Sequence, residues 1–531
     1  MSSSFLPKSI AAALLITFVS SFALGSTPFK NLDEVAQRLR LATYAQSASQ
    51  RTVKIAILDN GFHNYAKELG QSLPATTVFH AGPVPVDAKT EESHGLFMAQ
   101  IVSGLLAKTP KISYELHLFS AFGYSNLKSA IDTAVSEKFD VVLYSQVWEY
   151  GGNGDGRGFI NALVNRATTA GMVWINAAGN FGDTTYRAAI DRRLDDWAYL
   201  PSVNGGVRVR CFENAQKVCR LRAVLTWNDF KDDSTVGTDK DLDLVLTDDA
   251  QKILKTGGLQ QVKSIPPQAS AGLSLYPREI IEAELNPGIY ELRVKIRSQN
   301  FSKTDELRIV TSGDYLEQYE KSDVGETLLA PADNANVITI GASDSEKSSA
   351  SRLLGKPEIS LDSKMTLANG DNFKGSSNSA AMAAVLAVIA KALDPSRDRA
   401  GVQAFLAGRN SPSGGGSTSN NGNGGLSLEA LQFRPTGPGC FRAAILPVTP
   451  DAARGVLMGG AVVVETTSGY KIMTATDPFA MGLGPQRKRA DDMLVVDAKG
   501  FTVRSRSTQG ALQAGAYEIV QKPRGTSYCQ F

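Results

Sequence analysis

The sequence predicts an α/β fold with a doubly wound, mainly parallel sheet, an inserted all-β sandwich domain and a small, mostly β C-terminal domain. From residue 51, apolar runs typical of buried parallel strands alternate with segments of helical period. After about residue 205 the pattern changes to short alternating strands, and the buried-strand pattern returns at 336–342. A chain of 531 residues is also too long for one compact core. These observations together predict several domains, one of them inserted into another.

The first 25 residues have the pattern of a secretory signal peptide. Lys8 precedes a short apolar run that reaches small residues at Gly25. This run is shorter than the roughly 20 residues that span a bilayer. We therefore expect an exported protein, placed in the periplasm, at the cell surface or in the medium, with no membrane span in its mature chain. Residues 26–50 form a short segment before the first predicted strand.

The first part of the α/β domain is expected over residues 51–204. Continuous apolar runs predict its strands, and apolar residues at helical spacing predict the helices between them. The predicted strands are 52–59, 114–122, 139–147 and 172–180, and the predicted helices are 94–108, 125–138 and 158–171. Active sites of such sheets lie beyond the carboxyl ends of the strands, so the residues that follow each strand are the first to be considered.

The later part of the chain divides into three regions. Alternating strands predict the inserted sandwich over 205–320. The second part of the α/β domain is expected over 321–435, with a flexible low-complexity loop at 411–425. Residues 436–531 form the C-terminal, mostly β region.

The four cysteines fit an oxidising compartment. The simplest of the three connectivities pairs Cys211 with Cys219 and Cys440 with Cys529. No C-x-x-C motif is present, which excludes a thioredoxin-like redox motif. The net charge of +2 gives no indication of a nucleic-acid partner, and we expect none.

Four polar residues stand where this fold places its chemistry. Asp59 follows the first strand, His94 opens a helix, Asn180 follows a later strand, and Ser377 begins an apolar helix. Singly, each has a plainer explanation, such as a turn for Asp59 or helix capping for a serine near 376–377. Together they follow the order Asp–His–Ser, in which one form of the serine-protease triad occurs. An imidazole can activate the hydroxyl and a carboxylate can orient the imidazole. The Asn180 amide and the Ser377 backbone N–H can stabilise an oxyanion.

The four segments resemble the signature blocks of the subtilases, the subtilisin-like serine peptidases. The matching segments are Asp59-Asn60-Gly61, His94-Gly95-Leu96 with Ala99, Ala177-Ala178-Gly179-Asn180, and Gly375-Ser376-Ser377-Asn378-Ser379. The resemblance covers about 51–200 and 325–433. It implies a secreted serine endopeptidase that cleaves protein or peptide substrates through an acyl-enzyme intermediate. It also implies that Asp59, His94 and Ser377 are catalytic and that Asn180 serves the oxyanion hole.

Every block departs from the family pattern. Asn60, Leu96, Ser376 and Ala381 stand where the family has Ser or Thr, Thr, Thr and Pro, respectively. The family's substrate-binding edge has the form S-x-G. Here Ser145 is present, but Val147 occupies the glycine position, where a side chain can narrow or reshape the cleft. Residues 26–50 are also too few for a folded pro-domain. These departures motivate a second hypothesis, a catalytically weakened subtilase fold that acts as a binding or scaffold protein.

Other enzyme classes fit less well. A lipase or esterase of the α/β-hydrolase type needs its histidine after the nucleophile, but all four histidines precede residue 118. The metallopeptidase motif H-E-x-x-H is absent, so no catalytic metal is expected. The Asp-rich stretch 228–243 indicates either a solvated acidic loop or a structural Ca²⁺ site. We expect no required cofactor and a monomeric protein.

Overall fold

The computed structural model describes residues 28–86, 92–191, 196–200, 205–213, 218–266, 271–322 and 325–408. Beyond residue 408 it describes only the backbone of the strands between 435 and 530. The predicted signal peptide (1–25) and the predicted flexible loop (411–425) therefore lie outside the described residues.

The first domain is built on a seven-stranded sheet in which every pairing is parallel. In the order in which they lie across the sheet, the strands are β18 (Ile359–Leu361), β17 (Ile338–Ala342), β5 (Val173–Ala177), β4 (Val141–Tyr144), β1 (Val53–Asp59), β3 (Tyr114–Ser120) and β2 (Val78–His80). Helices cover both faces of β1, because Ile55 and Ile57 belong to one core and Ala56 and Leu58 to another. This two-sided burial explains the continuous apolar runs in the sequence.

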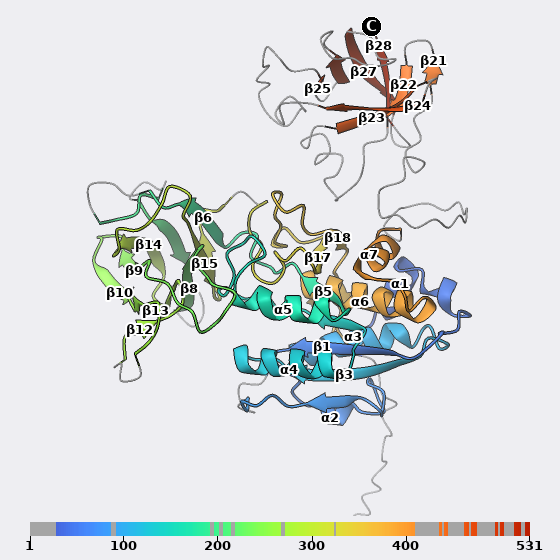
Figure 1. The fold of residues 1–531 in the computed structure, drawn as a ribbon, viewed down its shortest axis with the longest axis horizontal. Helices are drawn as coiled ribbons and strands as arrows, with labels where there is room; N and C mark the ends of the chain where they lie inside the picture. Colours follow the sequence, from blue (N-terminus) through green and yellow to red (C-terminus); the bar gives the residue numbers. More distant parts are fainter. Residues whose placement is uncertain are drawn as a thin grey trace, which may run out of the picture.

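Helices on both faces confirm the predicted doubly wound α/β class (Figure 1). One face carries α1 (Leu32–Arg38), the 3₁₀ helix η1 (Leu41–Tyr44), α3 (His94–Leu106), α6 (Ser376–Leu393) and α7 (Arg399–Ala407). The other face carries α4 (Tyr124–Ser136) and α5 (Phe159–Thr169), and the short helix α2 (Tyr65–Glu68) precedes β2. Among the described helices, α6 is the one whose length and apolarity would suffice to cross a membrane, and 94% of it is buried inside the domain.

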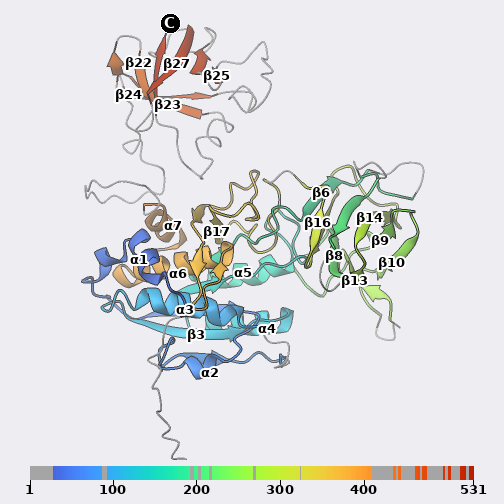
Figure 2. The same ribbon diagram turned by 180° about the vertical axis from the view of Figure 1, so that it is seen from behind.

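The inserted domain is a sandwich of two antiparallel sheets that lies beside the α/β domain (Figures 1 and 2). One sheet contains, in order, β10 (Ile253–Gly257), β9 (Leu242–Asp248), β14 (Gly288–Ile296), β7 (Val207–Cys211) and β16 (Leu316–Gln318). The other contains β13 (Arg278–Leu285), β8 (Cys219–Trp227), β15 (Glu306–Ser312) and β6 (Thr185–Ala189). A small pair, β11 (Gln260–Gln261) and β12 (Leu273–Ser274), lies at its side.

Two features of the sandwich bear on the sequence predictions. The predicted disulfide between Cys211 and Cys219 is present and joins β7 of one sheet to β8 of the other. The predicted start at residue 205 misses β6, which pairs with β15 and so belongs to the sandwich. The partner strand of β6 lies far along the chain, so no local pattern marks it as part of the sandwich.

The remaining strands form a hairpin and the C-terminal region. The hairpin of β19 (Met365–Thr366) and β20 (Asn372–Phe373) immediately precedes α6. The C-terminal strands are β21 (Pro435–Gly437), β22 (Cys440–Ala443), β23 (Ala461–Thr466), β24 (Gly469–Thr474), β25 (Leu494–Val496), β26 (Gly500–Val503), β27 (Gly515–Gln521) and β28 (Thr526–Gln530). The backbone register sets Cys440 opposite Cys529. Their side chains lie outside the description, so the second disulfide stays a prediction.

Candidate active site

Asp59 is the last residue of β1, and its side chain is fully buried at the carboxyl edge of the sheet. Four donors surround its carboxylate. The backbone N–H of Asn60 and the hydroxyl of Ser145 donate at 2.8 Å, and the amide nitrogen of Gln146 donates at 3.1 Å. The fourth donor is the Nδ1 atom of His94, 3.0 Å from both carboxylate oxygens. These donors satisfy a carboxylate that burial would otherwise leave without hydrogen-bond partners.

His94 is the first residue of α3, and its side chain keeps 23% of its surface exposed. The start of α3 approaches β1 closely, because a Cβ atom on Gly95 would lie only 2.6 Å from the Cβ atom of Asp59. Burial opposes the charged imidazolium, but the Asp59 carboxylate, together with Glu92, outweighs it and raises the pKa of His94. With Nδ1 held by Asp59, the opposite ring nitrogen, Nε2, is the atom that can accept a proton.

Ser377 is the second residue of α6, and it is 9% exposed. Its hydroxyl donates to the backbone carbonyl of Ser145 at 3.1 Å. Within the described ranges, the structure shows no hydrogen bond between Ser377 and His94, so the predicted contact between nucleophile and base is not formed here. Ser145 instead joins the two halves of the site, because its hydroxyl binds Asp59 and its carbonyl binds Ser377.

The alternative that a serine caps α6 is not what the structure shows. The N-cap is Gly375, which has no side chain with which to cap the helix. Ser376 is fully buried, and its hydroxyl accepts from the backbone N–H of Gly179 at 3.0 Å and donates to Asn180 at 3.2 Å. The Ser376 hydroxyl therefore links the start of α6 to Gly179 and Asn180, which leaves Ser377 as the candidate nucleophile.

Asn180 lies beside the start of α6. Its side-chain oxygen accepts from the backbone N–H of Ser376 at 3.0 Å. The side chain is exposed, and its Nδ2 atom would lie 3.1 Å from a Cβ atom on Gly375. A glycine at 375 therefore leaves room for the amide. The Asn180 side chain is thus anchored through its oxygen at the first turn of α6.

The predicted substrate edge, Ser145–Val147, begins directly after β4. The Val147 side chain packs against the apolar cluster formed by Ala178, Leu328 and Ala332. The next residue is held firmly: the Trp148 backbone N–H donates to the carbonyl of Ala330, and its indole N–H donates to the hydroxyl of Tyr144, both at 2.7 Å.

Gln146 is a member of the site that the sequence did not indicate. Its Nε2 atom lies 3.1 Å from both an Asp59 oxygen and the Nδ1 atom of His94. A residue between the expected serine and the glycine position has no local pattern that marks it. It becomes visible once β4 is known to lie next to β1.

No group of three or more His, Cys, Asp or Glu side chains within the described ranges is arranged to hold a metal ion. In the Asp-rich stretch, Asp229 pairs with Lys231 and Asp239 pairs with Lys263, each at 2.7 Å. Asp233 accepts hydrogen bonds from Thr235 within its own turn. These contacts favour an acidic loop that is partly neutralised by lysines, and the Ca²⁺ site stays a prediction.

Comparisons with known proteins identify no matching family model and no matching curated protein. Several solved structures are similar. The CspB protease of Clostridium perfringens is 12% identical over 67% of this chain and 85% of that one, with a TM-score of 0.39. MycP1 of Mycobacterium smegmatis is 12% identical over 72% and 79%, with a TM-score of 0.31. The subtilisin-like protease Apa1 of Pseudoalteromonas sp. AS-11 is 12% identical over 66% and 86%, with a TM-score of 0.24. The chain itself combines a seven-stranded parallel α/β sheet with additional antiparallel sheets.

Proposed function

We propose that this protein is a serine endopeptidase that hydrolyses peptide bonds with Asp59, His94 and Ser377. The observation that carries the proposal is the buried Asp59 carboxylate, held 3.0 Å from Nδ1 of His94 and linked through Ser145 to the Ser377 hydroxyl. If Asp59 had only a structural role, it would not need a histidine partner with a raised pKa at the carboxyl edge of the central strand.

The chemistry follows from the positions of these groups. When the Ser377 hydroxyl turns from the Ser145 carbonyl to Nε2 of His94, the imidazole can take its proton as the oxygen attacks the substrate carbonyl. Asp59 stabilises the imidazolium that forms. The Nδ2 atom of Asn180 and the backbone N–H of Ser377 donate to the oxyanion. His94 then protonates the leaving amine, and a water activated by the same imidazole hydrolyses the acyl-enzyme.

Peptide substrates would lie along the Ser145–Val147 edge. We further propose that the protein is exported, because a disulfide such as Cys211–Cys219 persists in oxidising compartments. The signal-peptide pattern at residues 1–25 supports the same location.

A second candidate function is a binding or scaffold protein on the same fold. Two observations favour it: Ser377 donates to a carbonyl instead of to His94, and the Gln146 amide lies against the Asp59–His94 pair. In this case the polar residues would be retained for stability and the cleft would only hold a ligand.

Covalent labelling with a fluorophosphonate probe separates the two functions. We expect the folded protein to be labelled at Ser377, with no labelling of Ser377→Ala and strongly reduced labelling of His94→Ala. Ser379→Ala is the matched control, because this buried serine of the same helix donates to the carbonyl of Leu361, away from the site. A folded wild-type protein that does not react would exclude the endopeptidase and leave the binding function.

A further inference from the structure

The segment that follows the proposed substrate edge is held by the inserted sandwich. We call residues 148–158 the edge loop. Its Glu149 carboxylate accepts from the guanidinium of Arg222 on β8 at 2.9 Å. The next residue of the loop is Tyr150, and the guanidinium of Arg278, at the start of β13, lies 3.9 Å from the centre of its ring. Two arginines on two sandwich strands thus contact adjacent residues of the loop. Arg222 forms an ion pair and Arg278 forms a cation–π contact.

A second set of contacts lies further along the edge loop. The Asn153 side chain binds the backbone of Phe230 in both directions, donating to its carbonyl at 3.1 Å and accepting from its N–H at 2.9 Å. The backbone N–H of Gly158 donates to Asp232 at 2.8 Å. The Phe230 ring itself packs on Phe159, the first residue of α5, with ring centres 5.8 Å apart. The sandwich therefore contacts the edge loop from its beginning to its end.

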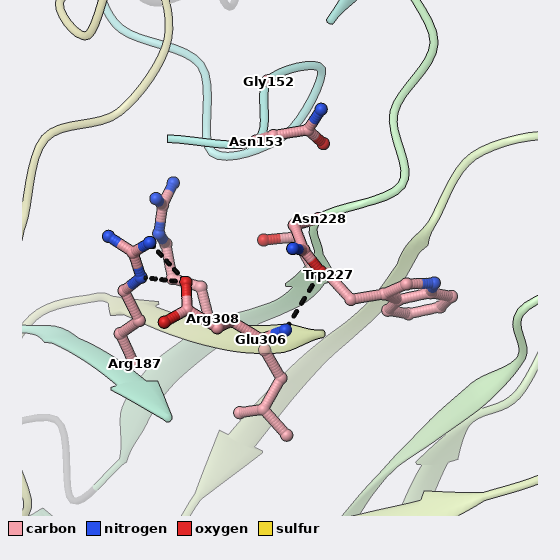
Figure 3. A pocket seen from close by; sticks show the side chains of 9 residues that line it. Gly152, Asn153, Arg187, Trp227, Asn228, Glu306 and Arg308 are labelled. Atoms are coloured by element: carbon pink, nitrogen blue, oxygen red, sulfur yellow. Dashed lines mark hydrogen bonds and ion pairs between the residues drawn. The ribbon is translucent and has the colours of Figure 1, made fainter. Parts of the chain in front are cut away.

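The two domains approach closely at this interface. A Cβ atom on Gly154 would lie 2.1 Å from the guanidinium of Arg308, which is itself buried on β15. Figure 3 shows Gly152 and Asn153 of the loop facing Arg308 and Glu306 of β15, with Arg187 of β6 bound to Glu306. Residues of the loop and of the sandwich line a small pocket here. The close approach of Gly154 to Arg308 limits how far the loop can shift without disturbing the sandwich.

The composition of the edge loop explains why it needs this support. Five of its residues are glycine, and four of these have positive φ angles: Gly151, Gly154, Gly156 and Gly158. Glycine loses more conformational freedom on ordering than any other residue. A loop of this composition keeps one shape only when outside contacts offset that loss. The α/β domain supplies such contacts at Trp148, Gly156 and Arg157. The sandwich supplies them at Glu149, Tyr150, Asn153 and Gly158.

We propose that Arg222, Phe230 and Arg278 of the inserted sandwich are positioning residues for the substrate edge Ser145–Val147. The inference rests on the proposed function, because it assumes that this edge binds the substrate backbone. The sandwich acts through the edge loop and touches neither Ser377 nor His94. Loss of the contacts between the sandwich and the edge loop therefore weakens the binding of extended substrates and leaves the reactivity of Ser377 intact.

The experiment compares two arginines of β8 that face different surroundings. Arg222→Gln removes the contact with Glu149 and also an ion pair with Glu282 of β13. Arg220→Gln is the matched control, because the Arg220 side chain is 82% exposed and pairs only loosely with Glu284, at 3.7 Å. Hydrogen exchange of the amides in 145–153 reports the edge without requiring activity. Fluorophosphonate labelling reports Ser377, and hydrolysis of β-casein reports the binding of an extended substrate.

We expect Arg222→Gln to speed exchange in 145–153 and to lower kcat/KM on β-casein about tenfold, mainly through KM, with labelling of Ser377 within about twofold of wild type. Arg222→Lys should recover part of the loss, and Glu149→Gln should add little to Arg222→Gln, because both variants remove the Arg222–Glu149 contact. Unchanged exchange and unchanged KM in folded Arg222→Gln would overturn the inference. If the wild type is not labelled at all, the endopeptidase fails, and the exchange comparison still decides whether the sandwich holds the edge.

Discussion

Two histidine sites of the α/β domain differ in what faces the imidazole. Nδ1 of His94 lies 3.0 Å from both oxygens of Asp59, and the carboxylate outweighs burial and raises the pKa of His94. His80 on β2 and His117 on β3 face each other instead, with 2.9 Å between Nε2 and Nδ1. Burial lowers the pKa of both.

The difference shows what turns a buried histidine into a candidate base. Burial alone keeps an imidazole neutral, whereas a carboxylate in direct contact lets it hold a proton. Near the His80–His117 pair, the carboxylates of Glu115 and Glu137 do not outweigh the burial, and Lys54 lowers the pKa of His117 further. The α/β domain therefore holds one histidine site suited to proton transfer and one suited to packing.

The largest expected effect comes from removing the carboxylate. Asp59→Asn should lower the rate of Ser377 labelling by about 10⁴-fold, because the imidazolium loses its stabilising charge and its tautomer is no longer fixed. The pKa of His94, followed by NMR, should fall below its wild-type value. The raised pKa of His94 stabilises the folded protein below about pH 6.5, and this stabilisation is lost as the pH rises through the folded-state pKa. Asp59→Asn should therefore remove this pH dependence of the folding stability. An unchanged His94 titration would contradict the comparison.

A smaller effect is expected when the serine that joins Asp59 and Ser377 loses its hydroxyl. Ser145→Ala removes one donor to the buried carboxylate and keeps the carbonyl that holds Ser377. A hydrogen bond to a charged group contributes about 1.5–3 kcal/mol, and the free energy of unfolding in urea should fall by that order. Ser136→Ala, at an exposed hydroxyl that donates to Thr133, is the control and should change little. Equal losses in the two variants would argue against a special role for Ser145.

Replacing Gln146 should move the pH profile with little effect on stability. Gln146→Leu removes a neutral donor that shares Asp59 with His94. The carboxylate then interacts more strongly with the imidazolium, so the pKa of His94 should rise and the acid limb of the labelling profile should move to higher pH. NMR titration of His94 in the Ser377→Ala background measures the same shift without activity. A downward shift would show that the amide supports the charged imidazole instead.

The smallest effect is expected at the packing pair. Because the folded-state pKa values of His80 and His117 are lowered, the unfolded chain binds more protons between those values and about pH 6.5. Stability should therefore fall as pH drops through this window. His117→Gln should flatten the dependence of Tm on pH between about 7.5 and 5. His63→Gln is the control. If Tm falls with pH as steeply in His117→Gln as in the wild type, the His80–His117 pair is not the neutral pair proposed here.

Most of the architecture could be predicted because its signals are local. The run of apolar residues in β1 and the helical period of α3 each depend on a few neighbouring residues. The predicted boundary of the sandwich failed at β6, since the strand that pairs with β6 comes long after it in the chain. The candidate residues Asp59, His94, Asn180 and Ser377 were found because each stands at the end of a strand or the start of a helix.

Residue periodicity and motif order predict the class of the fold, the Asp–His–Ser order and the position of each candidate residue, because they do not depend on contacts across the chain. The contacts of Ser376 with Gly179 and Asn180, those of Ser145 and Gln146 with Asp59, and those of the sandwich with the edge loop are visible only in the folded protein. These facts follow from β4 lying beside β1 and from the inserted domain folding back onto the segment after β4. Such neighbours in space are separated by long stretches of chain, and burial and packing alone bring them together.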